Sequence, residues 1–234
     1  MADEPAGAVY EAGVAGFLFD LDGTLVDSVY QHVLSWHEAL QAEGIELSVW
    51  RIHRRIGMSG GLFTNALLRE TDVEMTEERG QRLRDMHATV YKGRTELVRP
   101  LPGARELLDY LTAKRVPWAI ATSGRMASAS VTVSKLGLDA AKIPIVTRDQ
   151  VRYAKPDPDL FLAAAARLKI DVRKSIVVGD SVWDLLAAQR AGALGVGLLS
   201  GGYGQDELER AGAYRVYQDP QDMLKHLDEV GVRR

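Results

Sequence analysis

The 234-residue chain is long enough for one large domain, or for a core domain that carries a smaller one. With 46% hydrophobic residues, 26% charged residues and a formal net charge of −3, it has a globular composition and no charge excess to hold nucleic acid or an acidic membrane surface. It contains no cysteine, which excludes disulfide bonds, thiol catalysis and cysteine-bound metals.

The N-terminal residues lack the basic and apolar regions of a secretory signal. The longest weakly polar stretch, residues 191–199, is too short to cross a bilayer. We therefore expect a cytoplasmic protein, and we expect its first dozen residues to form a loose tail.

Short apolar or β-branched runs alternate with amphipathic helical patterns over most of the chain. This alternation predicts an α/β fold, a doubly wound parallel sheet covered by helices on both faces. The predicted strands are residues 14–19, 116–122, 143–147, 175–179 and 194–199, with a sixth candidate at a sheet edge, residues 213–217. The predicted helices between them are residues 105–114, 128–137, 158–169 and 181–192.

The interval between residues 26 and 97 breaks this alternation, because it shows helical patterns and no convincing strand. Ser28 and Gln31 match a capping box, and Gly44 is placed to end the helix that they begin. Further helices are predicted at about residues 48–55, 62–70 and 76–92. We therefore predict an all-helical cap domain, residues 27–97, inserted into an α/β core formed by residues 1–26 and 98–234. The first helix carries one apolar stripe: Val29, Val33, Trp36 and Leu40.

Polar groups follow four predicted strands in turn, and in a parallel sheet ligands bind beyond the carboxyl ends of the strands. Clustered carboxylates tolerate one another when a hard cation such as Mg²⁺ neutralises them, and a lysine beside a hydroxyl can hold a phosphoryl group. A carboxylate one residue beyond a nucleophilic carboxylate can act as an acid and then as a base. The pattern predicts a site that binds Mg²⁺ and transfers phosphate. In chain order these groups are Asp20, Asp22, Thr122, Ser123, Lys155, Asp180 and Asp184.

Each of these groups also has a purely structural interpretation. Asp22 fits an Asp-Gly turn, Thr122 and the serine after it fit a helix cap, and Lys155 fits a solvated loop. Ser181 with Asp184 fits a capping box, and for Asp184 this interpretation is the favoured one. Polar groups at four successive strand ends nevertheless favour a functional site.

In their order and spacing, the segments DLDGT, ATSG, AKPDPD and GDSVWD resemble the four motifs of the haloacid dehalogenase superfamily. The resemblance covers residues 17–197, and the helical insertion lies where that family carries its type 1 cap. It implies that Asp20 is the nucleophile, which forms an aspartyl-phosphate, and that Asp22 is the acid and base. It also implies that Thr122 and Lys155 hold the phosphoryl group, with Ser123 as a further substrate contact.

The same resemblance implies Mg²⁺ as the cofactor. Its ligands would be the carboxylates of Asp20 and Asp180 and the main-chain carbonyl of Asp22. Asp184 would support the metal or orient the lysine.

Within the superfamily, the chain is similar to the branch of phosphoglycolate phosphatases and β-phosphoglucomutases. The second motif-one aspartate, Asp22, disfavours dehalogenation, and a lone cap lysine at Lys92 disfavours phosphonate cleavage. The mutases resemble this chain at Asp27, His32, Trp36 and Gly57, but they place an arginine shortly after that glycine, where residues 58–61 read MSGG. Phosphoglycolate phosphatases usually follow the motif-two threonine with Asn-Lys, where residues 123–125 read SGR.

Three cap residues carry open alternatives. His32 is either a partly buried helix residue stacked on Trp36 or a cap residue that binds substrate and helps the leaving group, with function slightly favoured. Arg54 and Arg55 fit solvated positions, yet they flank the cap loop and could meet an anionic substrate.

The sequence thus predicts an enzyme, a Mg²⁺-dependent phosphatase that hydrolyses a small phosphorylated metabolite through an aspartyl-phosphate. One alternative is a sugar phosphomutase of the β-phosphoglucomutase type, and another is a non-catalytic regulatory relative. The expected partner is the small substrate alone, with no nucleic acid and no membrane, and the expected state is a monomer or a homodimer.

Overall fold

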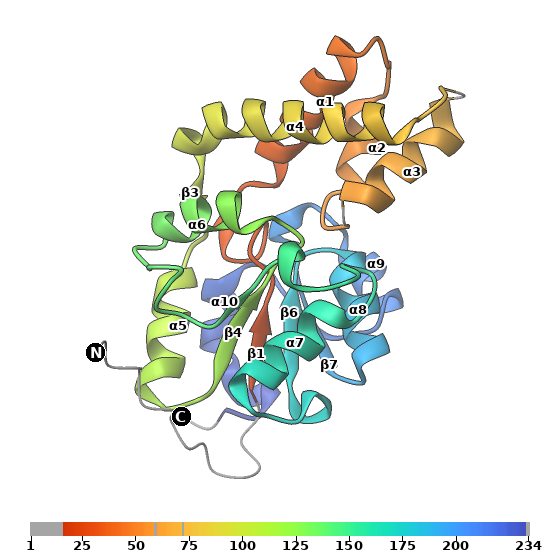
Figure 1. Cartoon of the computed structure of the whole chain (residues 1–234). Coiled ribbons are helices and arrows are strands. Elements are labelled where there is room, and N and C mark those ends of the chain that lie inside the picture. The colour runs from red at the N-terminus through yellow and green to blue at the C-terminus, as the bar shows by residue number, and fades with distance from the viewer. Residues whose placement is uncertain (1–15, 59, 72, 233–234) are drawn as a thin grey trace.

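The computed structural model describes residues 16–58, 60–71 and 73–232. Within them, the six predicted strands form one parallel sheet in the order β5-β4-β1-β6-β7-β8, and the sixth candidate lies at its edge, as expected (Figure 1). The predicted tail and the predicted start of the first strand, residues 14–15, lie outside the described residues. The strands are β1 (Phe17–Phe19), β4 (Trp118–Ala121), β5 (Ile145–Val146), β6 (Ile176–Gly179), β7 (Leu194–Leu198) and β8 (Ala213–Tyr217).

Helices cover both faces of this sheet, so the predicted doubly wound α/β fold is confirmed. Alternate residues of β1 enter different cores, since Phe17 and Phe19 pack on one face and Leu18 on the other. The first face is covered by α5, α6 and α10, and the second by α7 and α8. The helices of this part are α5 (Ala104–Ala113), α6 (Met126–Lys135), α7 (Asp159–Leu168), α8 (Val182–Ala191), α9 (Gln205–Arg210) and α10 (Pro220–Lys225). Short 3₁₀ helices are η1 (Thr95–Leu97), η2 (Arg148–Gln150), η3 (Val172–Lys174), η4 (Leu199–Gly201) and η5 (Leu227–Val230).

A helical layer lies beyond one end of the sheet, above the strand ends in Figure 1. It consists of α1 (Val29–Ala42), α2 (Val49–His53), α3 (Gly60–Thr71) and α4 (Glu77–Arg94). The chain enters and leaves this layer through a two-stranded antiparallel ladder, β2 (Val26–Asp27) with β3 (Arg99–Pro100), which the sequence did not predict. The ladder brings residues 26–27 and 99–100 side by side, close to the predicted cap boundaries. Those boundaries themselves stay a prediction.

The start of α1 differs from the prediction. The apolar stripe of this helix is buried as expected, among the residues of the cap core. Ser28 is the N-cap residue, but its side chain makes no capping hydrogen bond and its hydroxyl instead donates to Asp22 Oδ1 at 2.6 Å. The predicted capping box of Ser28 and Gln31 is therefore wrong, because a neighbouring carboxylate competes for the serine hydroxyl.

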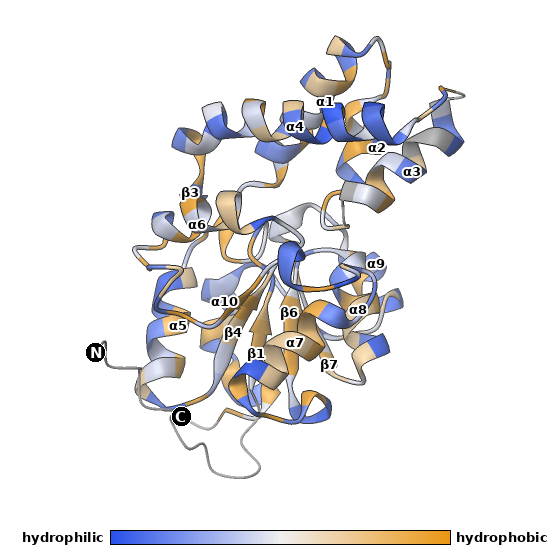
Figure 2. Ribbon diagram, viewed as in Figure 1, coloured by the Kyte–Doolittle hydropathy of each residue, from blue (hydrophilic) through white to orange (hydrophobic). Residues whose placement is uncertain are grey.

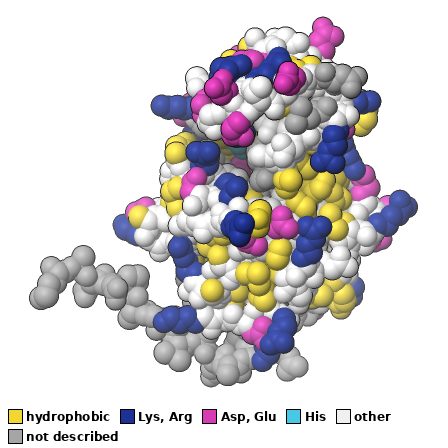
Figure 3. All heavy atoms as spheres, turned by 45° about the vertical axis from the view of Figure 1, so that its right-hand side comes forward, with side chains coloured by type: hydrophobic (Ala, Val, Ile, Leu, Met, Phe, Trp, Pro, Cys, Tyr) yellow, Lys and Arg dark blue, Asp and Glu magenta, His cyan; other side chains and the backbone are white. Residues whose placement is uncertain are grey.

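The distribution of polarity agrees with this layered arrangement. Figure 2 shows apolar residues concentrated in the strands of the sheet and hydrophilic residues on the outer turns of the helices. On the face seen in Figure 3, basic and acidic side chains are interspersed. Among the described helices, none combines the length and the apolar character that crossing a membrane requires.

Candidate active site

Asp20 is the first residue after β1, and its position follows from the pairing of that strand. Its backbone N–H donates to the carbonyl of Val178 in β6 at 2.9 Å, which continues the parallel ladder by one residue. Asp180 follows β6 directly in the same way. Because β1 and β6 are neighbours, the two carboxylates lie at adjacent strand ends, where both are less than 5% exposed.

Lys155 is fully buried between two carboxylates, so its interpretation as a solvated loop residue is wrong. Its ammonium group forms an ion pair with Asp20 Oδ1 and a second one with Asp184 Oδ1 at 2.8 Å. Burial lowers the pKa of this lysine, but the charges of Asp184 and Asp20 raise it further, so the net pKa lies above its ordinary value. The lysine therefore stays charged and joins two strand-end motifs.

Asp184 combines the two roles that were considered for it. Its Oδ2 accepts hydrogen bonds from the backbone N–H of Ser181 at 3.1 Å and from the Ser181 hydroxyl at 2.6 Å, which confirms the predicted capping box. Its other oxygen contacts Lys155. The helix cap thus holds the carboxylate in the orientation in which it can position the lysine.

Asp180 is surrounded by contacts that the sequence reasoning did not single out. The Thr24 hydroxyl donates to its Oδ1 at 3.0 Å. Gly23, at a φ of +86°, and Gly201 both approach this carboxylate so closely that a Cβ on either residue would collide with it. The sequence could have indicated Thr24 as a contact of Asp180, because it lies within the DLDGT motif. Nothing in the local sequence pointed to Gly201.

The carboxylates of Asp20, Asp180 and Asp184 form a cluster whose ligand oxygens lie within 4.8 Å of one another. Burial, opposed in part by Lys155, raises the pKa of Asp20 to about 7, and burial also raises that of Asp180 well above its ordinary value. Three buried carboxylates face one buried ammonium group, so the cluster lacks positive charge when all three are ionised. Oxygen donors with excess negative charge are the environment that Mg²⁺ prefers, and these residues fit that ion.

Asp22 lies apart from this cluster and is held from the cap side. Its Oδ1 accepts the hydrogen bond of Ser28 and faces His32 Nε2 at 3.3 Å. Burial raises the pKa of Asp22, but the charge and hydrogen bond of His32 and the hydrogen bond of Ser28 lower it more, so the net pKa lies below its ordinary value of 3.8. Asp22 is therefore ionised in the protein without substrate.

Thr122 and Ser123 follow β4 at the same end of the sheet. The Thr122 hydroxyl accepts from the backbone N–H of Gly124 at 3.0 Å, and the residue is only 1% exposed. The N-cap residue of α6 is Arg125, so the interpretation of this pair as the cap of that helix is wrong. Ser123 reaches the helical layer instead, where its hydroxyl donates to the carbonyl of Gly57 at 2.9 Å.

His32 stacks on a different ring from the one expected. Its imidazole lies 3.8 Å from the ring centre of Tyr91, whereas Trp36 stacks on His87 at 4.3 Å and on Phe63. The predicted His32–Trp36 stack is therefore wrong, because α4 inserts its own aromatic residues along α1. His32 does lie next to the predicted site, through Asp22.

Arg54 and Arg55 are both engaged by acidic side chains. Arg54 forms an ion pair with Glu207 and lies 4.2 Å from the ring centre of Tyr203. Arg55 forms an ion pair with Glu70, and its side chain is only 14% exposed. Neither arginine is simply solvated, and each already has a carboxylate partner.

The loop after α2 is fastened to the core by several further hydrogen bonds. The carbonyl of Arg54 accepts from Tyr203 Oη at 2.9 Å and from Trp183 Nε1 at 3.3 Å, and His53 Nε2 lies 2.7 Å from the carbonyl of Gly201. Together with the Ser123–Gly57 contact, these bonds hold the helical layer against the strand ends.

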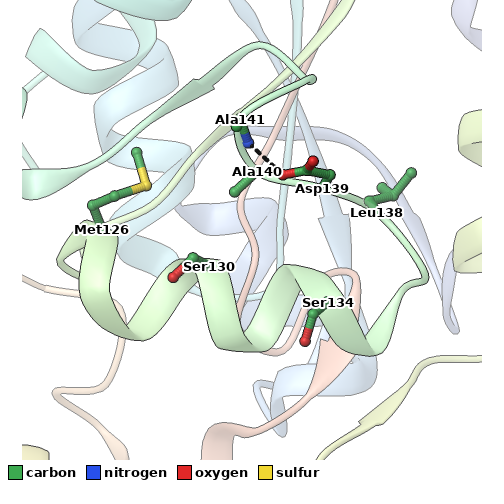
Figure 4. A pocket seen from close by; sticks show the side chains of 7 residues that line it. All are labelled: Met126, Ser130, Ser134, Leu138, Asp139, Ala140 and Ala141. Carbon is green, nitrogen blue, oxygen red and sulfur yellow. Dashed lines mark hydrogen bonds between the residues drawn. The ribbon is translucent and has the colours of Figure 1, made fainter.

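A pocket beside α6 is lined by none of the predicted site residues; its lining is Met126, Ser130, Ser134, Leu138, Asp139, Ala140 and Ala141 (Figure 4).

Comparison with known proteins identifies the family. A family model described as haloacid dehalogenase-like hydrolase matches residues 14–192. The chain belongs to this family. Hexitol phosphatase A of Escherichia coli is 35% identical over 181 residues, which are 76% of this chain and 79% of the relative. A phosphoglycolate phosphatase of Agrobacterium fabrum is 30% identical over 188 residues, 79% of this chain and 80% of the relative.

Solved structures agree with the fold of this haloacid dehalogenase-like hydrolase. A hydrolase from Pseudomonas syringae superimposes with a TM-score of 0.92 at 55% identity and covers 93% of this chain and 100% of its own. A putative β-phosphoglucomutase from Bacteroides vulgatus has a TM-score of 0.82 at 24% identity, covers 94% of this chain and 90% of its own, and shows the fold alone. The resemblance inferred from the motifs is thus confirmed, and the chain is an enzyme of the phosphatase type.

Proposed function

We propose that this enzyme is a Mg²⁺-dependent phosphatase that hydrolyses a small phosphorylated sugar or polyol through an aspartyl-phosphate on Asp20. The observation that carries this proposal is the buried cluster in which the carboxylates after β1 and β6 meet Lys155 and Asp184. There Asp20 is paired with Lys155 beside Asp180, and Asp22 follows two residues later.

In the first step, a carboxylate oxygen of Asp20 attacks the phosphorus atom, and the bond from phosphorus to the leaving oxygen breaks. Asp22 gives its proton to that oxygen. A phosphate dianion beside Asp22 raises the pKa of this carboxyl group, so Asp22 takes up the proton as the substrate binds. Lys155 and the Thr122 and Ser123 side chains hold the transferred phosphoryl group.

In the second step, a water molecule attacks the phosphorus of the aspartyl-phosphate. Asp22 takes a proton from this water, and the bond between phosphorus and the Asp20 oxygen breaks, which releases inorganic phosphate and regenerates the carboxylate. The lowered pKa of Asp22 in the substrate-free protein suits this role as base. Asp184 keeps Lys155 in place through its capped orientation.

The residues that would hold Mg²⁺ are Asp20 and Asp180, with the main-chain carbonyl of Asp22. When bound, the ion supplies positive charge to the transferring phosphoryl group and to the carboxylates around it.

The charge of the helical layer favours a neutral leaving group. The two arginines that flank its loop, Arg54 and Arg55, are already paired with Glu207 and Glu70. A leaving group with its own carboxylate or phosphate would need such a cation. Hexitol phosphatase A and a fructose-1-phosphate phosphatase, both from E. coli, are among the relatives, which supports a hydroxylated leaving group.

The test is a phosphate-release screen over polyol phosphates, sugar phosphates and phosphoglycolate, with Mg²⁺ or with EDTA. We expect release from polyol and sugar phosphates, weaker release from phosphoglycolate, and none in EDTA. Labelled substrate, quenched in acid, should leave phosphate on the wild type and on the surface control Asp206→Asn but not on Asp20→Asn. Full activity in EDTA, or a labelled Asp20→Asn, would refute the mechanism.

A phosphomutase of the same fold would differ from a hydrolase in where the phosphoryl group goes after Asp20 takes it. A mutase must hold a second phosphate in the helical layer, and the carboxylate partners of Arg54 and Arg55 compete with such a phosphate. Enzyme, Mg²⁺ and a hexose 1-phosphate with a trace of the bisphosphate should therefore give free phosphate and no hexose 6-phosphate. Stoichiometric conversion to the 6-phosphate would make the mutase the correct function.

A further inference from the structure

Behind Asp22, two histidines form a hydrogen-bonded chain that leads into the helical layer. His32, on α1, faces Asp22 Oδ1 with its Nε2 at 3.3 Å. The other ring nitrogen of His32, Nδ1, lies 3.2 Å from Nε2 of His87, on α4. His87 belongs to none of the four sequence motifs, and it is not among the groups of the mechanism proposed above.

Each ring nitrogen of His32 has a partner in this chain. A carboxylate oxygen accepts hydrogen bonds, so the proton between Asp22 and His32 lies on His32 Nε2. The hydrogen bond between His32 Nδ1 and His87 Nε2 holds the opposite side of the same ring. With both nitrogens engaged, the His32 imidazole is fixed in the orientation that faces Asp22.

Aromatic stacking holds both imidazoles in this arrangement. His32 stacks on Tyr91 with an angle of 10° between the rings, and His87 stacks on Trp36 with an angle of 17°. His87 and Tyr91 lie four residues apart on α4, so they project from the same side of that helix, toward His32. The Tyr91 hydroxyl also forms a hydrogen bond of 3.2 Å with Thr132 Oγ1 on α6 of the core. The stack thus gives the chain a fixed position relative to the core.

Burial, together with the nearby His32, lowers the pKa of His87 well below its ordinary value of 6.5. His87 is accordingly neutral at physiological pH, and a neutral imidazole offers one donor and one acceptor nitrogen. Both contacts on Asp22, from Ser28 and from His32, fall on Oδ1. Among the described contacts, Oδ2 is left to exchange a proton with the leaving group or with water.

We propose that His87 is a positioning residue of this enzyme: its hydrogen bond with His32 Nδ1 fixes the orientation of the His32 ring, and so orients the Asp22 carboxylate for proton transfer. This inference rests on the proposed function, since it assigns Asp22 the proton transfers. The arrangement is that of a catalytic base oriented by a further group that does not touch the substrate. Because the proton moves in the chemical steps, loss of this hydrogen bond should lower kcat and leave KM nearly unchanged.

The kinetic test compares His87→Phe, which keeps the stacking ring but removes the hydrogen-bonding nitrogen, with His87→Gln, whose side-chain amide can donate or accept a hydrogen bond from a similar place. His226→Phe, far along the chain and directly after α10, is the control for the same substitution. General acid–base catalysis contributes roughly 10²–10⁴-fold, and loss of its orientation should cost about 10-fold or more. We expect such a fall in kcat on a polyol phosphate for His87→Phe, with KM within about twofold and His87→Gln clearly closer to the wild type.

The leaving group supplies a second kinetic readout. p-Nitrophenolate leaves without a proton, so the first step with p-nitrophenyl phosphate does not need an oriented acid. The pre-steady-state burst of nitrophenolate in His87→Phe should therefore keep its rate, while the following turnover slows. Equal losses in the burst and the turnover, or equal losses in His87→Phe and His87→Gln, would show a structural role only and overturn the proposal.

An NMR measurement tests the chain without using activity. Long-range ¹H–¹⁵N spectra distinguish the two nitrogens of each imidazole, and they should show a protonated His32 Nε2 and a hydrogen-bonded Nδ1 in the wild type and in His87→Gln. In His87→Phe, the signal of His32 Nδ1 should shift, because that nitrogen loses its partner. An unchanged His32 in a folded His87→Phe refutes the inference. If the wild type releases no phosphate from any substrate while the NMR result holds, the proposed function fails and the assigned hydrogen bond does not.

Discussion

Ion pairs hold two sides of the candidate site in very different surroundings. We call the core residues Asp20, Lys155 and Asp184 the floor of the site, and the loop of the helical layer that carries Arg54 its roof. On the core side, Asp20, Lys155 and Asp184 form ion pairs in which every side chain is at most 5% exposed. On the cap side, Arg54 pairs with Glu207, and these side chains are 37% and 38% exposed. A buried pair that loses one partner leaves an uncompensated charge, whereas an exposed pair contributes little. The ion pairs of the floor are therefore expected to contribute more to stability than the exposed pair of the roof, which the hydrogen bonds of Tyr203, Trp183 and His53 also hold.

The largest effect is expected from the nucleophile on the floor. Asp20→Asn keeps the shape of the side chain but removes the attacking oxygen charge, so kcat should fall by at least about 10³-fold. The fold should survive, because removal of one charge relieves the repulsion among three buried carboxylates. Phosphate release and circular dichroism measure these two outcomes, and turnover near the wild-type rate would exclude Asp20 as the nucleophile.

The second-largest effect is expected from Lys155, which carries the only buried ammonium group of this cluster among the described residues. Lys155→Met should lower the free energy of unfolding by about 3–5 kcal/mol and abolish activity, because two carboxylates lose their partner. Lys142→Met removes a lysine that is 81% exposed and should change stability by less than about 0.5 kcal/mol. Denaturant titration of both variants measures the difference, and similar losses in the two would contradict the comparison of floor and exposed surface.

A metal-dependent change in stability should follow from the ionisation of the floor. The pKa of Asp20 is raised from 3.8 to about 7, so the folded protein binds this proton more tightly than the unfolded chain. Without metal, stability contributed by this proton is present at low pH and is lost as pH rises from about 4 to about 7. Mg²⁺ binds the ionised carboxylates, so it should raise the Tm more at pH 8 than at pH 5. At 100-fold excess over Kd, the added free energy of unfolding is about 3 kcal/mol.

The control for this metal effect is Asp180→Asn, which removes one predicted ligand and should lose most of the Mg²⁺-induced rise in Tm. EDTA should abolish phosphate release, and Ca²⁺, which prefers longer bonds and more ligands, should not restore it. An equal rise in Tm at both pH values, or an unchanged rise in Asp180→Asn, would argue against this metal site.

The smallest effect is expected from the roof. Glu207→Gln should reduce stability by about 1 kcal/mol or less, since the pair is exposed and screened. The hydrogen bond from Arg54 lowers the pKa of Glu207 below its ordinary value of 4.5. The contribution of Glu207 is thus complete above about pH 4.5 and is lost as pH falls through the lowered pKa. Thermal unfolding of the wild type and of Glu207→Gln between pH 3 and 7 measures this contribution. A stability difference between the two proteins that grows toward pH 3 would contradict the prediction.

Much of the core could be predicted from the sequence because its signals are local. The alternation of short apolar runs with amphipathic helices is enough to predict a parallel sheet, and six of its strands were found where expected. The motif residues then follow from topology, because the ends of parallel strands meet at one edge. Asp20, Lys155 and Asp180 could therefore be placed together without any structure.

Contacts between distant segments could not be predicted in this way. The hydrogen bond of Thr24 with Asp180 joins residues 156 positions apart, and that of His32 with His87 joins residues 55 positions apart. Ser28 shows the same limit at short range, since its local pattern indicates a helix cap but a carboxylate takes its hydroxyl.

The sequence by itself determined the fold class, the family resemblance and the residues at the strand ends, because hydrophobic periodicity and motif spacing act over a few neighbouring residues. Only the tertiary structure decided which oxygen of Asp22 is occupied, which ring stacks on His32 and which carboxylates engage Arg54 and Arg55. Those choices depend on how the helical layer packs against the core, and side chains brought together by packing compete for partners that no local pattern records.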